Sequence, residues 1–379
     1  MSDTVISPVG LAPTRRYKIC VVTPRLSITG VPLAQTRFAG ALARHGHEVE
    51  FVIGEPDGLE PPVIPGVKVT LWHKPRVAQM LAPMVEYLRR EKPDVVFSAE
   101  DHLNGVVLTA AIVARSKAKI SGSSRVSPYD SYSNKPFSVG WWRKQMLRSV
   151  MWRADALTCV SRDMVDEYRT IFPDAPHVCV YNIIDDAASR ARAKEPVEHP
   201  WFNQREVPVI VAAGTLTRRK AFHDLVEAVR IISERGRDVR LAIFGEGHQR
   251  QRLETMVADY GLQDKVWLPG RVSNPRAYFS KAPISALSSR AEGLPNVLVE
   301  TMVCGCTPVS TDCPTGPREV IGDDQYGYLA KVHDPESLAA ALERALNRPV
   351  PPERLRDATA PFEETRVIQR HFEVLGLAA

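Results

Sequence analysis

The chain has 379 residues, a formal net charge of +5 and a hydrophobic fraction of 44%. This length exceeds one ordinary hydrophobic core and suits two domains, and the composition excludes a chain that is disordered throughout. The mild positive charge fits phosphate-bearing ligands or an anionic membrane surface without requiring either. It does not imply nucleic acid, because the 49 Lys and Arg residues are spread along the chain and matched by 44 acids.

The first half alternates between buried strands and helices. After a loose tail over residues 1–16, the β-branched run 17–23 predicts a buried strand, residues 27–31 a glycine turn, 33–44 a helix and 48–53 a second strand. The pattern continues with helices over 76–90 and 103–114 and strands over 93–97, 156–160 and 177–181. Strands that alternate with helices indicate a parallel sheet.

The second half repeats this order after a linker rich in Pro, His and charge at 195–206. Residues 208–213 predict a strand, 214–220 a polar turn, 221–236 a helix and 239–244 the next strand, followed by a turn at 245–247. A helix over 335–346 and a last one near 364–375 are also expected. The sequence therefore predicts two Rossmann-like α/β domains with parallel sheets facing across a cleft.

Two carboxylates bracket one predicted helix start in the second half. Glu292 lies in the loop Glu292-Gly293-Leu294-Pro295, and Glu300 lies on the helix that follows. A helix N-terminus offers unpaired N–H groups, so an anionic or hydroxyl-rich ligand could rest between the acids. Paired acids also suggest a glycosidase, but that chemistry requires them to flank a glycosidic bond and needs no turn rich in cations.

A basic turn follows the first strand of the second half. Arg218, Arg219 and Lys220 come shortly after Gly214, where a nucleoside diphosphate would arrive. Fixed cations stabilise the charge that builds on a leaving diphosphate, although a solvated turn has the same composition. In the first half, Gly30 lies in a βα turn where a phosphate could approach the backbone, and an ordinary tight turn explains it equally well.

Polar residues after the strand at 93–97 form a candidate acceptor site. Asp101, His102 and Asn104 could orient or deprotonate an acceptor hydroxyl, or form a plain surface loop. The segment from Trp141 to Arg153 mixes aromatic residues with cations at helical spacing, as interfacial helices do, but a core helix with basic exposed positions is the simpler interpretation.

The sequence predicts no metal site and no membrane span. Its six cysteines lie in apolar segments without paired metal-ligand spacing, and Cys304-Gly305-Cys306 is too short for the usual zinc pattern. The longest apolar run, 105–114, is far below the roughly 18 residues that a membrane helix needs. The N-terminus has no apolar core of signal-peptide length. We expect a cytoplasmic protein without a metal cofactor, in peripheral contact with the inner membrane surface.

Taken together, these segments resemble retaining glycosyltransferases of family 4, which have the two-domain GT-B fold. Glu292 to Glu300 is similar to the family's E-x7-E motif, and residues 310–319 (STDCPTGPRE) are similar to the run that follows it. Val180-Tyr181-Asn182-Ile183 resembles the family's interdomain asparagine segment. The resemblance covers most of the chain and implies a first domain over 1–195, completed by a C-terminal helix over 363–379, and a donor-binding domain over 206–350.

The resemblance also implies a role for each matched position. Glu292 would face the donor sugar, Glu300 would hold the ribose hydroxyls and Lys220 would bind the diphosphate, while Gly30 and Asp101 or His102 would belong to the first domain's part of the site. Contacts to the sugar would come from one segment, which consists of Gly293, Leu294, Pro295, Asn296 and Val297. Contacts to the nucleotide base would come from a second segment, which consists of Gly270, Arg271 and Val272. The family turn G-R-L followed by K-G is here Gly214-Thr215-Leu216 and Lys220-Ala221, so Arg218 or Arg219 would replace the missing arginine.

The implied reaction is metal-independent transfer of a sugar from a nucleoside diphosphate sugar, with uridine diphosphate favoured, and with retention at the anomeric carbon. The acceptor would be a glycan or a lipid-linked molecule in bacterial surface polysaccharide or lipopolysaccharide assembly. Two alternatives stay open: a nucleotide-sugar epimerase, which needs no acceptor, and a non-catalytic subunit that binds nucleotide sugars, which Thr215 would suit.

Overall fold

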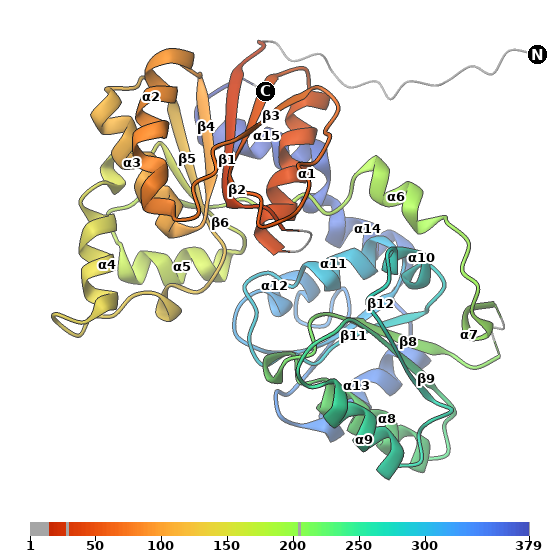
Figure 1. Ribbon diagram of the computed structural model, residues 1–379. Helices are drawn as coiled ribbons and strands as arrows, with labels where there is room; N and C mark the ends of the chain where they lie inside the picture. The colour runs from red at the N-terminus through yellow and green to blue at the C-terminus, as the bar shows by residue number, and fades with distance from the viewer. Residues whose placement is uncertain (1–14, 28–29, 204–205, 379) are drawn as a thin grey trace, which may run out of the picture. The chain divides into compact units, whose positions relative to one another are not determined.

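The computed structural model describes residues 15–27, 30–203 and 206–378, and it divides into two compact units (Figure 1). The first unit combines Met1–Ile183 with Thr365–Ala379, and the second is Ile184–Glu364. Residues 184–195, which the sequence assigned to the first domain, belong to the second unit. The predicted tail at 1–14 and Ile28 and Thr29 of the predicted glycine turn lie outside the described residues.

The first unit is built on a parallel sheet, which in the described residues has the strand order β3-β2-β1-β4-β5-β6-β7. The strands are β1 (Lys18–Arg25), β2 (Glu48–Glu55), β3 (Val67–Leu71), β4 (Val95–Ala99), β5 (Lys119–Ser124), β6 (Ala156–Cys159) and β7 (His177–Cys179). Strands β1, β2 and β4 are buried on both faces, as their continuous apolar sequences predict.

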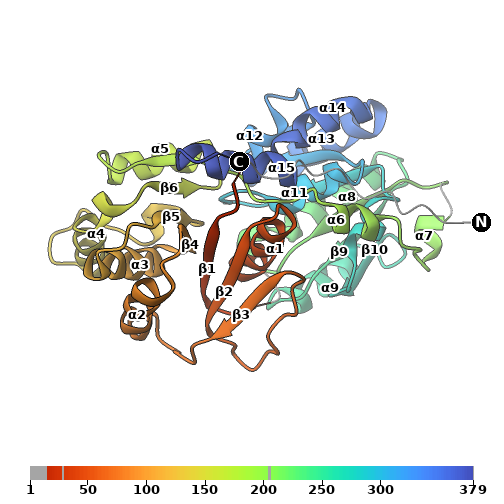
Figure 2. The same ribbon diagram turned by 90° about the horizontal axis from the view of Figure 1, so that it is seen from above.

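Helices cover both faces of this sheet (Figure 2). One core contains α1 (Gly30–Arg44) and α15 (Glu364–Val374), and the opposite core contains α2 (Leu81–Glu91) and α3 (Asp101–Ala114). The helix α4 (Val139–Arg148) packs on the outer side of α3, and α5 (Arg162–Ile171) contacts β6 and β7. Of the six cysteines, Cys20, Cys159, Cys306 and Cys313 are buried, and all six are free thiols.

The second unit has a parallel sheet of its own, with the order β10-β9-β8-β11-β12-β13 in the described residues. Its strands are β8 (Val209–Ala213), β9 (Arg240–Phe244), β10 (Val266–Gly270), β11 (Ile284–Leu287), β12 (Thr307–Thr311) and β13 (Tyr328–Ala330). The order steps outward from β8 in both directions, so the carboxyl ends of β8 and β11 flank the topological switch point where ligands of open α/β sheets bind.

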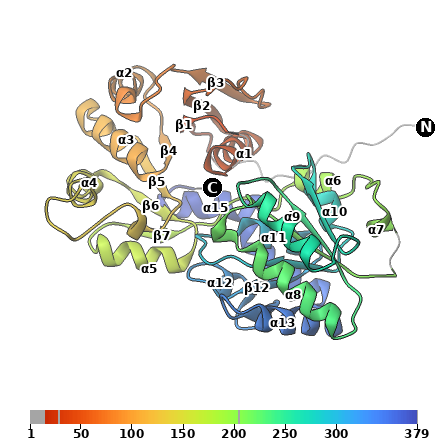
Figure 3. The same ribbon diagram turned by 60° about the horizontal axis from the view of Figure 1, so that its bottom comes forward.

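Helices also cover both faces of the second sheet (Figure 3). One face packs against α8 (Phe222–Glu234), α9 (Arg250–Asp259) and α13 (Pro335–Asn347). The remaining helices of this unit are α6 (Ala187–Ala193), α7 (Pro200–Asn203), α10 (Pro275–Phe279), α11 (Asn296–Val303), α12 (Pro317–Ile321) and α14 (Pro352–Thr359). Helix α11 begins at Asn296, directly after the predicted loop, and Pro295 occupies its N-cap.

The segments that begin and end the second unit are hydrogen-bonded to each other. The amides of Ile184 and Asp185 donate to the Phe362 carbonyl at 3.1 and 3.2 Å, and the Glu364 amide donates to the Asp185 carbonyl at 3.0 Å. Arg190 donates two hydrogen bonds to the Asp185 carboxylate, at 2.7 and 2.6 Å. No helix of the described residues is long and apolar enough to span a bilayer.

Candidate active site

Glycines end three adjacent strands of the second unit and bring their turns together. The Gly214 amide donates to the Phe244 carbonyl at 2.9 Å, and the Gly245 amide donates to the Gly270 carbonyl at 2.8 Å. A Cβ at Gly245 would lie 1.9 Å from the Gly214 carbonyl oxygen, and Gly245 has φ +145°. Only glycine permits this approach, so the turns after β8, β9 and β10 form one packed edge.

The basic turn after β8 folds into the 3₁₀ helix η4 (Arg218–Lys220) and places Lys220 beside Glu292. The Lys220 Nζ lies 2.6 Å from the Glu292 Oε1, and the two side chains are only 15% and 8% exposed. These residues are 72 positions apart in the sequence. The predicted diphosphate cation and the predicted sugar-facing carboxylate therefore share one site.

The loop that carries Glu292 is fastened to η4 on one side. The Ser288 hydroxyl donates to the Lys220 carbonyl at 2.8 Å, and the Arg290 amide donates to the Arg219 carbonyl at 2.8 Å. Because both bonds reach the η4 backbone, they fix the Lys220 and Glu292 segments relative to each other. The sequence alone did not identify Ser288 or Arg290.

The run at 310–319 holds the other side of the same loop. The Thr315 hydroxyl donates to the Glu292 carbonyl, and a Cβ at Gly316 would lie 2.8 Å from the Gly293 carbonyl oxygen and 2.7 Å from Pro295. Burial, and then the nearby Glu292 charge, raise the pKa of the Cys313 thiol to about 12. This thiol stays protonated at neutral pH, so the run supports the loop and supplies no thiolate nucleophile.

Glu300 projects from α11 toward a buried arginine that the sequence prediction missed. The Arg276 Nη2 lies 3.2 Å from the Glu300 Oε1 and donates to the Ile184 carbonyl at 3.0 Å. The Arg276 side chain is only 5% exposed, whereas that of Glu300 is 19% exposed. An arginine with one short-range partner of opposite charge can fix the direction of that carboxylate.

The other predicted donor residues lie around this edge with different exposure. Thr215, Arg218, Arg219 and Arg271 are exposed, and Gly214, Val272, Gly293, Asn296 and Val297 are half-buried. Leu294, Pro295 and Gly270 are buried. The structure thus places exposed arginines on the β8 turn, where the prediction needs a substitute for the missing one.

The predicted acceptor residues lie in the first unit at the start of α3. Asp101 accepts hydrogen bonds from the hydroxyls of Ser124 at 2.5 Å, Tyr132 at 2.6 Å and Tyr168 at 2.7 Å. Three hydroxyl donors give this carboxylate a bracing role between α3, β5 and α5, and its acceptor role stays a prediction. The neighbouring His102 is exposed, with its Nε2 3.3 Å from the Glu100 Oε2.

Glu100, the neighbour of Asp101, was not selected from the sequence and has two unusual properties. Its φ of +78° is unusual for a residue with a side chain, and burial is the main cause that raises the pKa of its carboxyl group. Strained backbone with a perturbed acid is common at functional sites. Gly30 opens α1 with φ +67° and no atom within 4 Å of an added Cβ, so its predicted phosphate contact has room.

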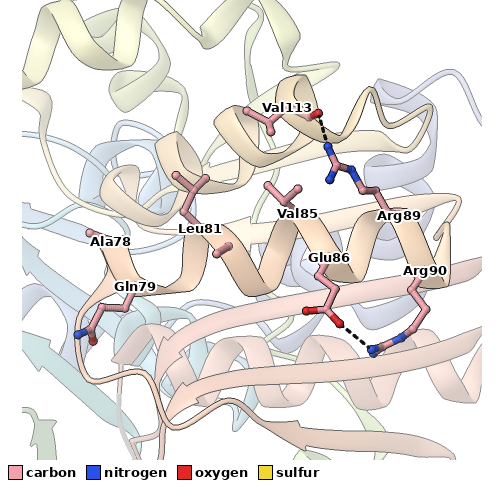
Figure 4. Close-up of a pocket in the computed structure, with 9 residues that line it drawn as sticks. Ala78, Gln79, Leu81, Val85, Glu86, Arg89, Arg90 and Val113 are labelled. Carbon is pink, nitrogen blue, oxygen red and sulfur yellow. Dashed lines mark hydrogen bonds and ion pairs between the residues drawn. The ribbon is translucent and has the colours of Figure 1, made fainter.

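Two further observations concern ligands. A surface groove of about 850 Å³ on the outer side of α2 is lined by residues such as Leu81, Val85 and Arg89 and by none of the predicted site residues (Figure 4).

Within the described residues, no cluster of three or more His, Cys, Asp or Glu side chains could hold a metal ion. Metal independence remains a prediction.

Comparison with known proteins divides the chain into two parts that correspond to the two structural units. Residues 29–182 match the glycosyl transferase 4-like domain, and residues 195–360 match glycosyl transferases group 1. An N-acetylgalactosamine-N,N'-diacetylbacillosaminyl-diphospho-undecaprenol 4-alpha-N-acetylgalactosaminyltransferase of Campylobacter jejuni is 30% identical over 216 residues, 56% of each chain. The chain thus spans little more than half the length of this curated relative.

Solved structures share the fold over nearly the whole chain. The lipopolysaccharide outer core galactosyltransferase WaaB has a TM-score of 0.74 at 17% identity, covering 95% of this chain and 99% of its own. Anabaena HepE in complex with UDP has a TM-score of 0.75 at 17% identity, with the same coverage. With the two family matches covering both units, the chain belongs to the family 4 type of glycosyltransferases with the GT-B fold.

Proposed function

We propose that this protein transfers a sugar from a nucleoside diphosphate sugar to a glycan or lipid-linked acceptor during assembly of a bacterial surface polysaccharide or lipopolysaccharide. Uridine diphosphate is the favoured leaving group, the anomeric configuration is retained and no metal is required. The enzyme would work at the cytoplasmic face of the membrane.

The contact between Lys220 and Glu292 carries this proposal. It joins a phosphate-binding type of side chain to a carboxylate at the carboxyl edge of a parallel sheet, with Glu300 on the next helix. The names of similar proteins support the same chemistry: the Campylobacter relative is named for a diphospho-undecaprenol substrate, and the HepE structure contains UDP. Undecaprenol is a lipid, so a substrate of that kind agrees with the lipid-linked acceptor that we propose.

Each residue has a distinct task in the proposed reaction. Lys220 and the exposed Arg218 or Arg219 would neutralise the diphosphate as its bond to the anomeric carbon breaks, when its negative charge increases. Glu292 would accept hydrogen bonds from sugar hydroxyls and face the positive charge that develops on the sugar ring. Glu300 would accept hydrogen bonds from the ribose. The acceptor oxygen would attack from the face that the diphosphate leaves, and its proton would pass to a departing phosphate oxygen.

A donor screen tests the proposal. Purified protein is mixed with uridine, guanosine and adenosine diphosphate sugars, with and without a lipid-linked glycan acceptor, and released nucleoside diphosphate is measured. Release that requires acceptor, with an α-linked product from an α-linked donor, supports retaining transfer. An isomeric sugar nucleotide formed without acceptor would identify an epimerase, and donor binding without turnover would identify a binding subunit. Activity that disappears with EDTA and returns with a divalent ion would contradict metal independence.

A further inference from the structure

One stretch of the first unit, residues 126–152, exposes an unusual number of large apolar side chains at its surface. Seven of them lie between residues 126 and 152, and each is between 51% and 79% exposed. We call this surface the α4 face, and its apolar members are Val126, Tyr129, Phe137, Val139, Trp142, Met146 and Trp152. Scattered single apolar residues are normal on a protein surface, whereas a concentration of this kind marks an interaction site.

The helix α4 displays an apolar stripe because it packs on the first unit through a different side. Leu147 is its buried side chain and points toward Gly105 of α3, where an added Cβ would meet it at 3.6 Å. Val139, Trp142 and Met146 follow at intervals of three and four residues, so they line one side of the helix. That side lies roughly 100° from Leu147 at about 100° per residue. The apolar stripe therefore lies beside the packed side of the helix, and the exposure of its three members, 57% to 70%, shows that it faces solvent.

The segment before α4 holds another aromatic side chain outward. Phe137 is 79% exposed and has φ +61°, a conformation that costs energy for a residue with a side chain. Its ring lies 5.6 Å from that of Trp141, and the Ser138 hydroxyl caps α4 by accepting a hydrogen bond from the Trp141 amide. Because the exposed ring packs little against its own fold, we attribute its placement to an outside partner.

Cations accompany the apolar residues, and acids are missing from the same stretch of sequence. Lys135, Arg143 and Arg148 are exposed, and residues 131–154 contain no Asp or Glu. Arg148 has a distant acidic neighbour from another segment, since its Nη2 lies 4.0 Å from the Oδ2 of the exposed Asp174. Exposed tryptophans beside cations are suited to the headgroup region of a bilayer with anionic lipids. A second copy of this chain fits poorly, because it would bring these cations against one another.

We propose that the α4 face docks the first unit on an anionic lipid bilayer. This inference rests on the proposed function, since a lipid-linked acceptor would be presented at such a surface. The tryptophan and methionine side chains would enter the headgroup boundary, and the three exposed cations would lie against lipid phosphates. Contact of this kind needs no spanning helix.

Vesicle flotation of the full chain tests the proposal, using phosphatidylcholine vesicles with and without phosphatidylglycerol. We expect binding that requires phosphatidylglycerol and weakens with salt. Trp142→Ala with Trp152→Ala should reduce the vesicle affinity at least about tenfold, from loss of buried apolar area. Arg143→Gln with Arg148→Gln should reduce it about fivefold for each cation removed.

Matched controls on the same unit separate this surface from general effects. Leu59→Ala with Val63→Ala removes exposed apolar side chains, and Lys92→Gln with Lys117→Gln removes exposed cations, and both pairs should bind vesicles like the wild type. Equal binding by all variants, or equal binding to both kinds of vesicle, would overturn the proposal. So would a dimer in sedimentation that the tryptophan variant converts to a monomer without lipid.

A separate measurement keeps this inference distinct from the proposed function. The affinity for UDP in solution depends on the second unit and should not change in the α4-face variants. Vesicle binding without any sugar transfer would contradict the proposed function alone. Transfer to acceptor without preferential binding to anionic vesicles would contradict the α4-face proposal alone.

Discussion

Ala221 offers a sharp test of how the basic turn is built, because it has a side chain where the related turns have glycine. Its φ of +46° and ψ of +37° place it in the left-handed region, and it is fully buried between η4 and α8. Ala221→Gly removes a left-handed strain of about 1–2 kcal/mol. It also loses about 0.8 kcal/mol of methyl burial and about 0.4–1 kcal/mol through the more flexible unfolded chain. The net change in unfolding free energy should be within about 1 kcal/mol of zero.

Ala228→Gly is the matched control, since Ala228 is equally buried but lies inside α8 with ordinary helical geometry. It should lose about 0.8 kcal/mol of burial and about 1 kcal/mol of helix propensity, which gives a destabilisation of about 2 kcal/mol. Urea denaturation followed by tryptophan fluorescence compares the midpoints of the two variants. If Ala221→Gly lowers the midpoint as much as Ala228→Gly does, the reasoning about backbone strain is wrong.

Three further predictions follow from the site and the cores. Lys220→Ala should lower turnover by more than about tenfold, through loss of a charge-assisted phosphate contact, and an unchanged rate in the coupled nucleotide-release assay would remove Lys220 from the site. Arg276→Gln should weaken binding of UDP about tenfold in calorimetry, but that of 2′,3′-dideoxy-UDP by no more than about twofold, if Arg276 holds Glu300 in the ribose-binding direction that we propose; equal losses would contradict this positioning role. Burial lowers the pKa of His371 to about 3, from 6.5, so below about pH 6.5 the unfolded chain binds a proton that the folded chain does not. Stability should therefore fall as the pH drops from 6.5 toward 3, by up to about 1.4 kcal/mol per pH unit, and His371→Gln should flatten this slope in denaturation midpoints measured across that range.

The elements that sequence reasoning found are those in which burial dominates the local pattern. Strands β1, β4, β8 and β9 are apolar runs between turns, and α8 and α13 have clear helical periodicity. Strand β5, with the sequence KISGSS, was missed because its buried positions hold serine and glycine. The serine hydroxyls of this strand lie inside the first unit, where that of Ser124 donates a hydrogen bond to Asp101. Such a strand is specified by its neighbours in the sheet and not by its own composition.

The residues of the candidate site also divide into those that the sequence identified and those that it did not. Glu292, Glu300 and Lys220 stand out because their residue types and spacing have a chemical meaning before folding. Arg276 belongs to none of the motifs found in the sequence, and only the short helix α10 brings its side chain beside Glu300. The aromatic and basic segment at 141–153 was interpreted as a core helix, whereas α4 buries a single side chain. Both cases depend on which side of a short helix meets the rest of the protein, and a short helix carries too few residues to show that in sequence.

We expect the proposed donor to be recognised by an exchange of partners at the Lys220–Glu292 pair. The two charges lie 2.6 Å apart, and both side chains are largely buried. A diphosphate that binds Lys220 leaves the Glu292 carboxylate without its cation, and an uncompensated buried charge is costly. A nucleotide sugar offers hydroxyl donors to that carboxylate, whereas a free nucleotide does not. We therefore expect the wild type to bind UDP-sugar more tightly than UDP, and Glu292→Ala to bind both with nearly equal affinity in calorimetry. If the ratio of the two affinities is unchanged in Glu292→Ala, Glu292 does not face the sugar.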